Sequence, residues 1–178
     1  SMAARQTYLS KSRVISAWQC PRKLYLEKHR PELAQVAAQT KSLFATGHQV
    51  GMIAQALYGT ADSVTIPFNR QTSPMVRQTK ALIDNGADFP IFEATFQSEG
   101  VVVRVDVLLP EAGRWRAVEV KAATSVKDYY VLACASQDWG LRKSGLHLAA
   151  LALAHNDKQF VYAGADKYDG ILSEVDLT

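Results

Sequence analysis

The sequence has few cysteines and no long apolar run. Only two of its 178 residues are cysteine, Cys20 and Cys134, too few for the disulfide framework of a small secreted protein. No apolar stretch approaches the roughly 20 residues that cross a bilayer, and the N-terminus lacks the apolar core of a secretory signal. Internal repeats and low-complexity tracts are also absent. These absences predict reduced thiols and a cytoplasmic protein with no membrane partner.

Composition and charge are those of one globular domain. Hydrophobic residues make up 48% of the chain and charged residues 21%, and the length suffices for a sizeable core. We therefore expect a single domain over residues 1–178. The net charge of +3 is uneven, because residues 1–41 hold eight Lys/Arg against two Glu and the remainder carries −3. A basic helical N-terminal arm favours a nucleic-acid partner, although a solvated helical face explains it equally well.

Cations and aromatic residues are interleaved in this arm. Arg13, Arg22 and Lys23 alternate with Trp18 and Tyr25. Cations grip a phosphate backbone and aromatic rings stack on exposed bases, so the segment is a candidate DNA-binding surface. The alternative is that these aromatic side chains belong to the core.

The most informative stretch is a predicted β-hairpin. Two runs rich in β-branched and apolar residues, 101–109 and 115–121, flank a set of turn residues. With a four-residue loop between the strands, Pro110 pairs with Trp115. The pairing of the remaining residues then follows from this register.

That register sets Asp106 opposite Glu119, with Lys121 one pleat further along the same face. Two facing carboxylates on apolar strands are destabilising, and a bound cation removes the conflict. An aspartate followed by Glu-x-Lys is what a metal-dependent phosphodiesterase requires. The alternatives are a solvated strand edge and an Asp106 carboxylate that is satisfied by Arg104.

Periodicity and turn residues define the other elements. The predicted helices cover 32–58, 73–85 and 127–144, and the predicted strands cover 63–68, 89–97, 146–154 and 159–163, with a turn over 155–158. Ser73 is the expected N-cap of the second helix. Glu93 is expected opposite Arg104, in a cross-strand ion pair. The order predicts an α+β fold with a mixed central sheet flanked by helices.

Two polar residues lie on apolar helix faces. His48 stands at the border of the apolar stripe of the long first helix, where a histidine is more often a packing residue than a ligand. Gln137 is the polar member of an otherwise apolar row in the last helix. A buried amide needs partners, so Gln137 either makes structural hydrogen bonds or reaches a ligand.

This order of elements, with these residues, resembles the PD-(D/E)xK nuclease superfamily, and more closely the RecB-type nuclease domain and the Cas4-like CRISPR-adaptation nucleases. The motifs that carry the likeness are Gly47-His48 in the long helix, Asp106 on the second core strand, Glu119-Val120-Lys121 on the third, and Gln137 on the following helix. Cys20, followed by a proline, is similar to the start of that branch. The resemblance implies a restriction-endonuclease-like αβββαβ core, with its sheet and helix over residues 89–165.

The resemblance also implies a metal-dependent deoxyribonuclease that prefers single-stranded or end-bearing DNA. Its metal, Mg²⁺ or Mn²⁺, would be held by His48, Asp106, Glu119 and the Val120 carbonyl. Lys121 would orient or deprotonate the attacking water, and Gln137 would help to place the substrate strand. CRISPR-adaptation or DNA-repair proteins are the implied protein partners.

The sequence departs from the family pattern in three places. Val105 replaces the proline before the motif aspartate, and Leu141 replaces the tyrosine after the motif glutamine. Relatives with an iron–sulfur cluster use one N-terminal cysteine and three near the C-terminus, whereas no cysteine follows Cys134 here. Cys20 is then only a remnant, and we expect no complete cluster. Either the chain is the N-terminal part of a longer protein, or its lineage has lost the cluster.

The departures keep two other interpretations open. One is a catalytically inactive nuclease fold that binds nucleic acid or a partner protein. The other is a structural α+β domain whose acids are simple ion pairs.

Overall fold

The computed structural model describes residues 9–10, 51–121, 137–156 and 172–177. The described strands are β1 (Leu9–Ser10), β2 (Val64–Thr65), β3 (Ile91–Ser98), β4 (Val101–Glu111), β5 (Arg114–Lys121), β6 (Leu148–Asn156) and β7 (Leu172–Asp176). The described helical segments are residues 51–58, α4 (Thr72–Asp84) and residues 137–143. None of these helices has the length and apolar character that crossing a membrane requires.

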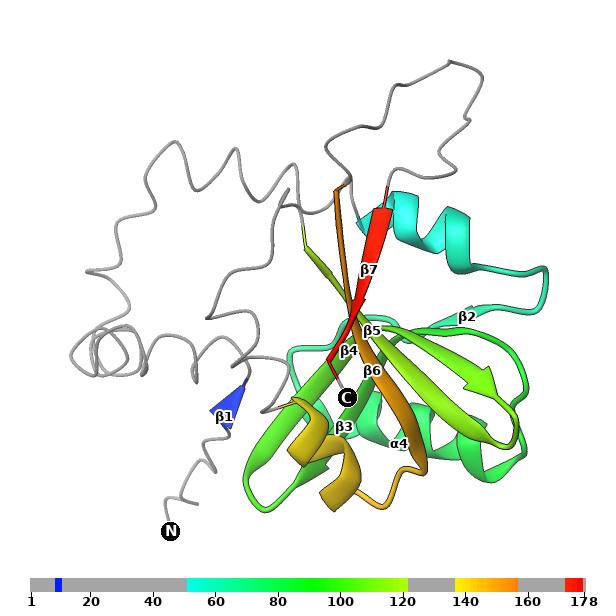
Figure 1. Cartoon of the computed structure of the whole chain (residues 1–178). Helices are drawn as coiled ribbons and strands as arrows, with labels where there is room; N and C mark the ends of the chain where they lie inside the picture. The colour runs from blue at the N-terminus through cyan, green and yellow to red at the C-terminus, as the bar shows by residue number, and fades with distance from the viewer. Residues whose placement is uncertain (1–8, 11–50, 122–136, 157–171, 178) are drawn as a thin grey trace, which may run out of the picture.

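The strands form one mixed sheet, which confirms the predicted α+β class. Six strands lie in the order β2-β3-β4-β5-β6-β7, and β1 pairs with the start of β4. Strands β3, β4 and β5 form an antiparallel meander, β5 pairs with β6 in parallel, and β7 runs antiparallel to β6. The crossover from β5 to β6 contains the helical residues 137–143 (Figure 1).

Helices cover both faces of the sheet. Along β5, Trp115 and Ala117 belong to the larger hydrophobic cluster, whereas Val118 belongs to the smaller one, as expected for side chains that alternate between faces. Residues of α4 and of segment 137–143 pack against the larger cluster, and residues of segment 51–58 pack against the smaller one. The sheet is therefore buried on both sides, which explains why its central strands are so apolar.

The central hairpin has the predicted register with a shorter loop. Pro110 pairs with Trp115 as expected, but Glu111 and Arg114 also pair, so that only Ala112 and Gly113 form the loop. Both loop residues have positive φ, 48° and 78°. This conformation matches the twist of the flanking strands and makes a two-residue loop favourable.

The predicted position of Glu93 opposite Arg104 is wrong. The hairpin between β3 and β4 turns at residues 99–100, and this register places Thr95 opposite Arg104. Glu93 has no register partner on β4 and adopts a φ of 61°, which is uncommon outside glycine. The predicted ion pair nevertheless forms diagonally, with Arg104 Nε 2.7 Å from Glu93 Oε2.

Two further predictions need correction. His155 lies within β6 and not in a turn, and the described antiparallel partner of β6 is β7. The sequence of β7 shows no apolar alternation because all of its residues are partly or fully exposed. The predicted strand over 159–163 lies outside the described residues. Ser73 is not the N-cap of α4: Gln71 holds that position and makes no side-chain capping bond. Gly86, with φ 79°, follows the C-cap of α4, a conformation that favours glycine.

Candidate active site

The predicted site lies where β4 and β5 separate. Their pairing extends from the hairpin loop as far as Val107 and Val118 and is not continued to Asp106 and Glu119. Residues 119–121 instead remain paired with β6 on their other side. The predicted register is therefore right, but the two strands part at the pair of acids. We call this point the fork.

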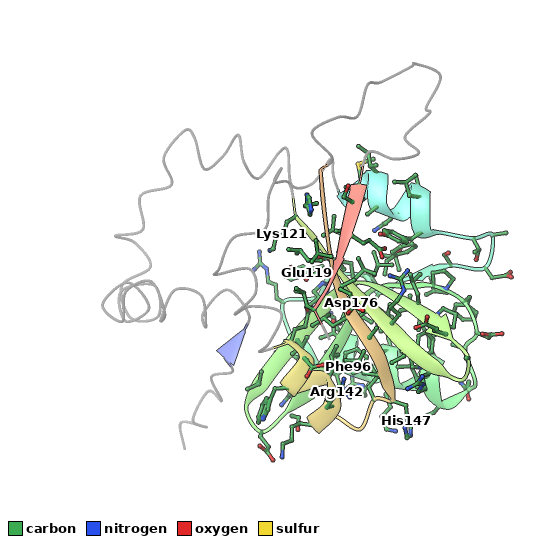
Figure 2. All side chains as sticks on the ribbon, in the orientation of Figure 1. Phe96, Glu119, Lys121, Arg142, His147 and Asp176 are labelled. Carbon is green, nitrogen blue, oxygen red and sulfur yellow. The ribbon has the colours of Figure 1, made fainter. Side chains whose placement is uncertain are left out.

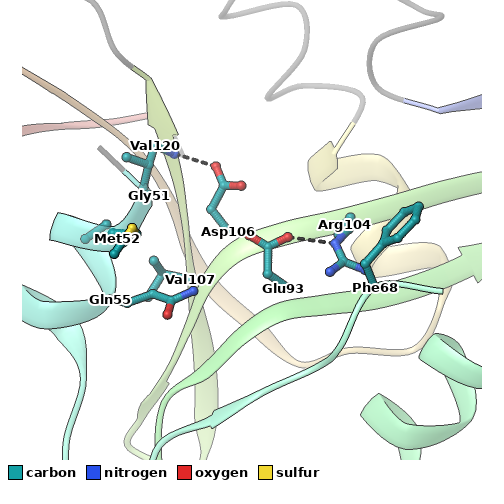
Figure 3. Close-up of a pocket in the computed structure, with 10 residues that line it drawn as sticks. Gly51, Met52, Gln55, Phe68, Glu93, Arg104, Asp106, Val107 and Val120 are labelled. Carbon is teal, nitrogen blue, oxygen red and sulfur yellow. Dashed lines mark hydrogen bonds and ion pairs between the residues drawn. The ribbon is translucent and has the colours of Figure 1, made fainter. Parts of the chain in front are cut away.

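Asp106 bridges the fork. Its Oδ2 accepts a hydrogen bond of 2.7 Å from the backbone N–H of Val120 (Figure 3). The side chain thus replaces the strand-to-strand hydrogen bonding that is lost as the strands separate. The bond fixes the Asp106 carboxylate against the Glu-x-Lys segment.

Glu119 is a buried carboxylate with two neighbours of suitable polarity. The residue is 1% exposed, and Lys121 Nζ lies 3.1 Å from its Oε1. Its Oε2 accepts a hydrogen bond of 3.3 Å from Gln137 Nε2. Burial of an isolated carboxylate is costly, so the ammonium and the amide supply the compensation that this position needs. Figure 2 labels Glu119 and Lys121 near the same end of the sheet.

Gln137 is buried to the same degree and only half satisfied. It is 1% exposed, and its Nε2 also donates to the Arg104 carbonyl at 3.4 Å. Its Oε1 has no hydrogen-bond partner within the part of the chain that the structure describes. An unsatisfied buried acceptor is uncommon in native structures and often marks a position that a water or ligand completes.

A close helix-to-strand contact positions Gln137. A Cβ built on Gly140 would lie 2.5 Å from Val103 Cγ2, a distance at which atoms clash. Glycine therefore lets segment 137–143 approach β4 more closely than any other residue would. This approach brings Gln137 within reach of Glu119.

A pocket of about 400 Å³ opens beside Asp106. Its walls include Asp106 and Val120 at the fork, Gln55 from segment 51–58, and the Glu93–Arg104 ion pair (Figure 3). A negative carboxylate and a positive guanidinium thus face the same space. Such a space suits a ligand that carries both a metal-binding anion and polar groups.

The donors at the fork fit a hard divalent cation that retains water. No cluster of three or more His, Cys, Asp or Glu side chains suited to a metal occurs among the described residues. Mg²⁺, however, is commonly held by one or two carboxylates and completed by water and substrate phosphate oxygens. Asp106 and Glu119 supply such carboxylates, and Gln137 Oε1, which has no hydrogen-bond partner among the described residues, is a further acceptor beside Glu119.

Five of the predicted site residues make contacts at the fork, in two sets that the neighbouring residues Glu119 and Val120 join along β5. Asp106 contacts Val120, and Glu119 contacts both Lys121 and Gln137. The other predicted residues lie outside the described part of the chain: His48, Arg13, Arg22, Lys23 and Cys20.

The sequence analysis did not identify the pocket residues Met52, Gln55 and Phe68. Gln55 lies four residues after Gly51, which also lines the pocket, and three after Met52, so helical periodicity could have indicated this face. Phe68 follows a proline between β2 and α4 and was predicted only as the last residue of a strand over 63–68. No sequence signal placed its side chain at the pocket.

Comparison with known proteins assigns no family to this chain. No family model matches the chain, and no curated protein matches it. Among solved structures, the crystal structure of SSO0001 is similar at 13% sequence identity and a TM-score of 0.48, over 99% of this chain and 69% of that chain. A likeness at this level assigns no function.

Proposed function

We propose that this protein is a metal-dependent nuclease that hydrolyses DNA phosphodiester bonds, with single-stranded or end-bearing DNA as its substrate. One observation carries the proposal: at a fork in the sheet, Asp106 is hydrogen-bonded to Val120 beside a pocket, and the adjacent Glu119 is paired with Lys121. The resemblance of the same motifs to the RecB-type and Cas4-like nucleases supports it. Mg²⁺ or Mn²⁺ is the proposed cofactor, and His48 is a further proposed ligand on which the argument does not depend.

The carboxylates have the role of holding the metal. Asp106 and Glu119 present hard oxygen donors, and the Val120 carbonyl is the additional ligand that the resemblance implies. The Asp106–Val120 bond and the Gln137–Glu119 bond fix the orientation of both acids before substrate arrives. When bound, the metal supplies Lewis-acid polarisation of the phosphoryl oxygen and lowers the pKa of its bound water.

Lys121 has the role of positioning the nucleophile. Its ammonium is held 3.1 Å from Glu119 and is partly exposed, so a water or phosphate oxygen can reach it. In the reaction, water attacks phosphorus, the bond from phosphorus to the leaving oxygen breaks, and that oxygen takes up a proton. The products are a phosphate monoester end and a hydroxyl end. Lys121 stabilises the negative charge that develops on the phosphoryl oxygens.

Cleavage of labelled DNA tests the proposal. End-labelled single- and double-stranded DNA is incubated with the purified chain and Mg²⁺, Mn²⁺ or EDTA, beside Lys121→Ala. We expect cleavage only with metal and a rate lower by about 10²- to 10⁴-fold in Lys121→Ala. Metal-independent cleavage, or equal cleavage by Lys121→Ala, would contradict the assignment of the site.

An inactive module that binds nucleic acid or a partner protein is the alternative proposal. It is favoured by the internal pairing of Glu119 with Lys121, which balances the buried charge without a metal. The two proposals differ in their response to Mn²⁺. A nuclease gains thermal stability with Mn²⁺ and loses this gain in Asp106→Ala, whereas an inactive fold shows no gain in either protein.

A further inference from the structure

Two of the exposed large hydrophobic side chains stand at one pocket. Three large hydrophobic side chains among the described residues are exposed: Met52 (60%), Phe68 (75%) and Trp139 (40%). Met52 and Phe68 line the pocket that contains Asp106, and Figure 3 shows them on opposite sides of it. Single exposed apolar residues are ordinary, but two around a pocket with a carboxylate in its wall indicate a binding surface.

The exposed ring of Phe68 stands on a fixed backbone. Two residues before it, Ile66 is buried, and its N–H donates to the Phe92 carbonyl at 2.9 Å. Directly after it, the Asn69 N–H donates to Met75 Sδ at 3.4 Å. Phe68 is thus anchored on both sides while its side chain remains in solvent. A ligand that stacks on this ring loses little affinity to ordering of the protein.

Arg104 supports one side of the ring. Its Cζ lies 5.6 Å from the centre of the Phe68 ring, in cation–π range. The guanidinium is itself held by Glu93 at 2.7 Å and by the Ile66 carbonyl at 3.2 Å. The cation therefore orients the ring and adds positive charge beside it. A flat aromatic ligand attached to an anion is the chemistry that this pair of residues recognises.

We propose that Phe68 is the stacking platform for a nucleobase of single-stranded DNA, adjacent to the phosphate that the fork binds. The inference rests on the proposed function for the position of that phosphate. It specifies more than that function does, because a platform for an unpaired base favours single strands and frayed ends over an intact duplex. Duplex DNA keeps its bases stacked on one another and offers none to Phe68.

Equilibrium binding in EDTA tests the platform without cleavage. The probes are a short fluorescein-labelled single-stranded DNA and a strand of equal length in which tetrahydrofuran replaces every base. The proteins are wild type, Phe68→Ala, Phe68→Trp and Trp139→Ala. Trp139 is the matched control, because it is an exposed aromatic with Lys143 Nζ 5.9 Å from its ring centre and does not line the pocket. Thermal melting confirms that each variant is folded.

We expect Phe68→Ala to weaken binding of the DNA by roughly 5- to 150-fold, which is ~1–3 kcal/mol per stacked base converted at 1.4 kcal/mol per tenfold. Phe68→Trp restores the affinity, and Trp139→Ala leaves it unchanged. On the base-free strand, wild type and Phe68→Ala bind alike. Equal affinity of wild type and Phe68→Ala for the DNA overturns the inference. So does an equal loss of affinity of Phe68→Ala for the base-free strand, or no DNA binding by wild type.

Cleavage of the same DNA in Mg²⁺ or Mn²⁺ separates the two proposals. If wild type does not cleave but its binding depends on Phe68 and on the bases, the platform stands and the nuclease proposal fails. If wild type cleaves and Phe68→Ala binds as wild type does, the nuclease stands and the platform fails. If both hold, we expect Phe68→Ala to raise KM more than it lowers kcat.

Discussion

The Asp106 carboxylate accepts a hydrogen bond of 2.7 Å from the backbone N–H of Val120, across the point at which β4 and β5 separate. This bond ties the second core strand to the Glu-Val-Lys segment of the third. Both acids of the proposed site lie on strands, Asp106 on β4 and Glu119 on β5. A site on strands is held rigidly, which suits groups that must keep a fixed geometry.

Lys121 is predicted to matter for stability as well as for activity. Lys121→Met leaves Glu119 buried without the Lys121 ammonium, and we expect the free energy of unfolding to fall by about 1–3 kcal/mol, less than for a fully buried pair because Lys121 is partly exposed. Adding Glu119→Gln should recover much of this loss. Urea denaturation without divalent metal measures both. Equal stability of wild type and Lys121→Met would show that the pair is not what compensates the buried charge.

Gly140 is predicted to position Gln137. A methyl group in Gly140→Ala clashes with Val103, so we expect segment 137–143 to shift away from β4 and stability to fall by about 1–3 kcal/mol. Val103→Ala in the same chain removes the clash and should offset part of the loss, which a double-mutant cycle measures. Strictly additive effects of the two substitutions would contradict the proposed contact.

Thr79 is predicted to satisfy a buried backbone group. Its Oγ1 accepts a hydrogen bond of 2.9 Å from the Thr95 N–H and donates one to the Met75 carbonyl. Thr79→Val keeps the shape but leaves the Thr95 N–H without this acceptor, at a cost of about 1–3 kcal/mol. Thr79→Ser retains the hydroxyl and should lose less. Denaturant midpoints of the two variants give the comparison, and a greater loss in Thr79→Ser would refute it.

Tyr58 is predicted to make stability fall at alkaline pH. Burial, and then its hydrogen bond to Glu174, raise the pKa of the Tyr58 phenol above its ordinary value of about 10. The folded chain therefore keeps this proton to higher pH than the unfolded chain does. The resulting stabilisation is complete below pH ~10 and is lost as pH rises above that value. The stability difference between wild type and Tyr58→Phe should be constant near neutrality and shrink at alkaline pH; a constant difference throughout would contradict the assignment.

The elements with strong local signals were predicted from the sequence. The β-branched run of β4 and the alternation of β5 predicted the hairpin and the register that pairs Pro110 with Trp115. The Glu93–Arg104 ion pair was also predicted, although the register behind it was wrong. Local patterns carry this information because burial and turn conformation act on neighbouring residues.

The features that depend on tertiary structure were not predictable. The sequence gives no signal for the fork, because no local pattern indicates that β5 separates from β4 at Glu119 while it remains paired with β6. The short and partly exposed β7 has no apolar alternation. Phe68 reaches the pocket only because the chain between β2 and α4 folds over Arg104. Contacts between residues far apart in sequence decide all three.

The single-turnover rate of DNA cleavage in two matched variants tests the central claim most directly. Asp106→Asn removes a carboxylate at the fork, and Asp84→Asn makes the same change at an exposed residue of α4 that pairs with Lys80. With Mg²⁺ or Mn²⁺ present, we predict that Asp106→Asn cleaves at least about 10²-fold more slowly, while Asp84→Asn cleaves as wild type does. Equal rates for Asp106→Asn and wild type would contradict a metal-dependent nuclease centred on this fork.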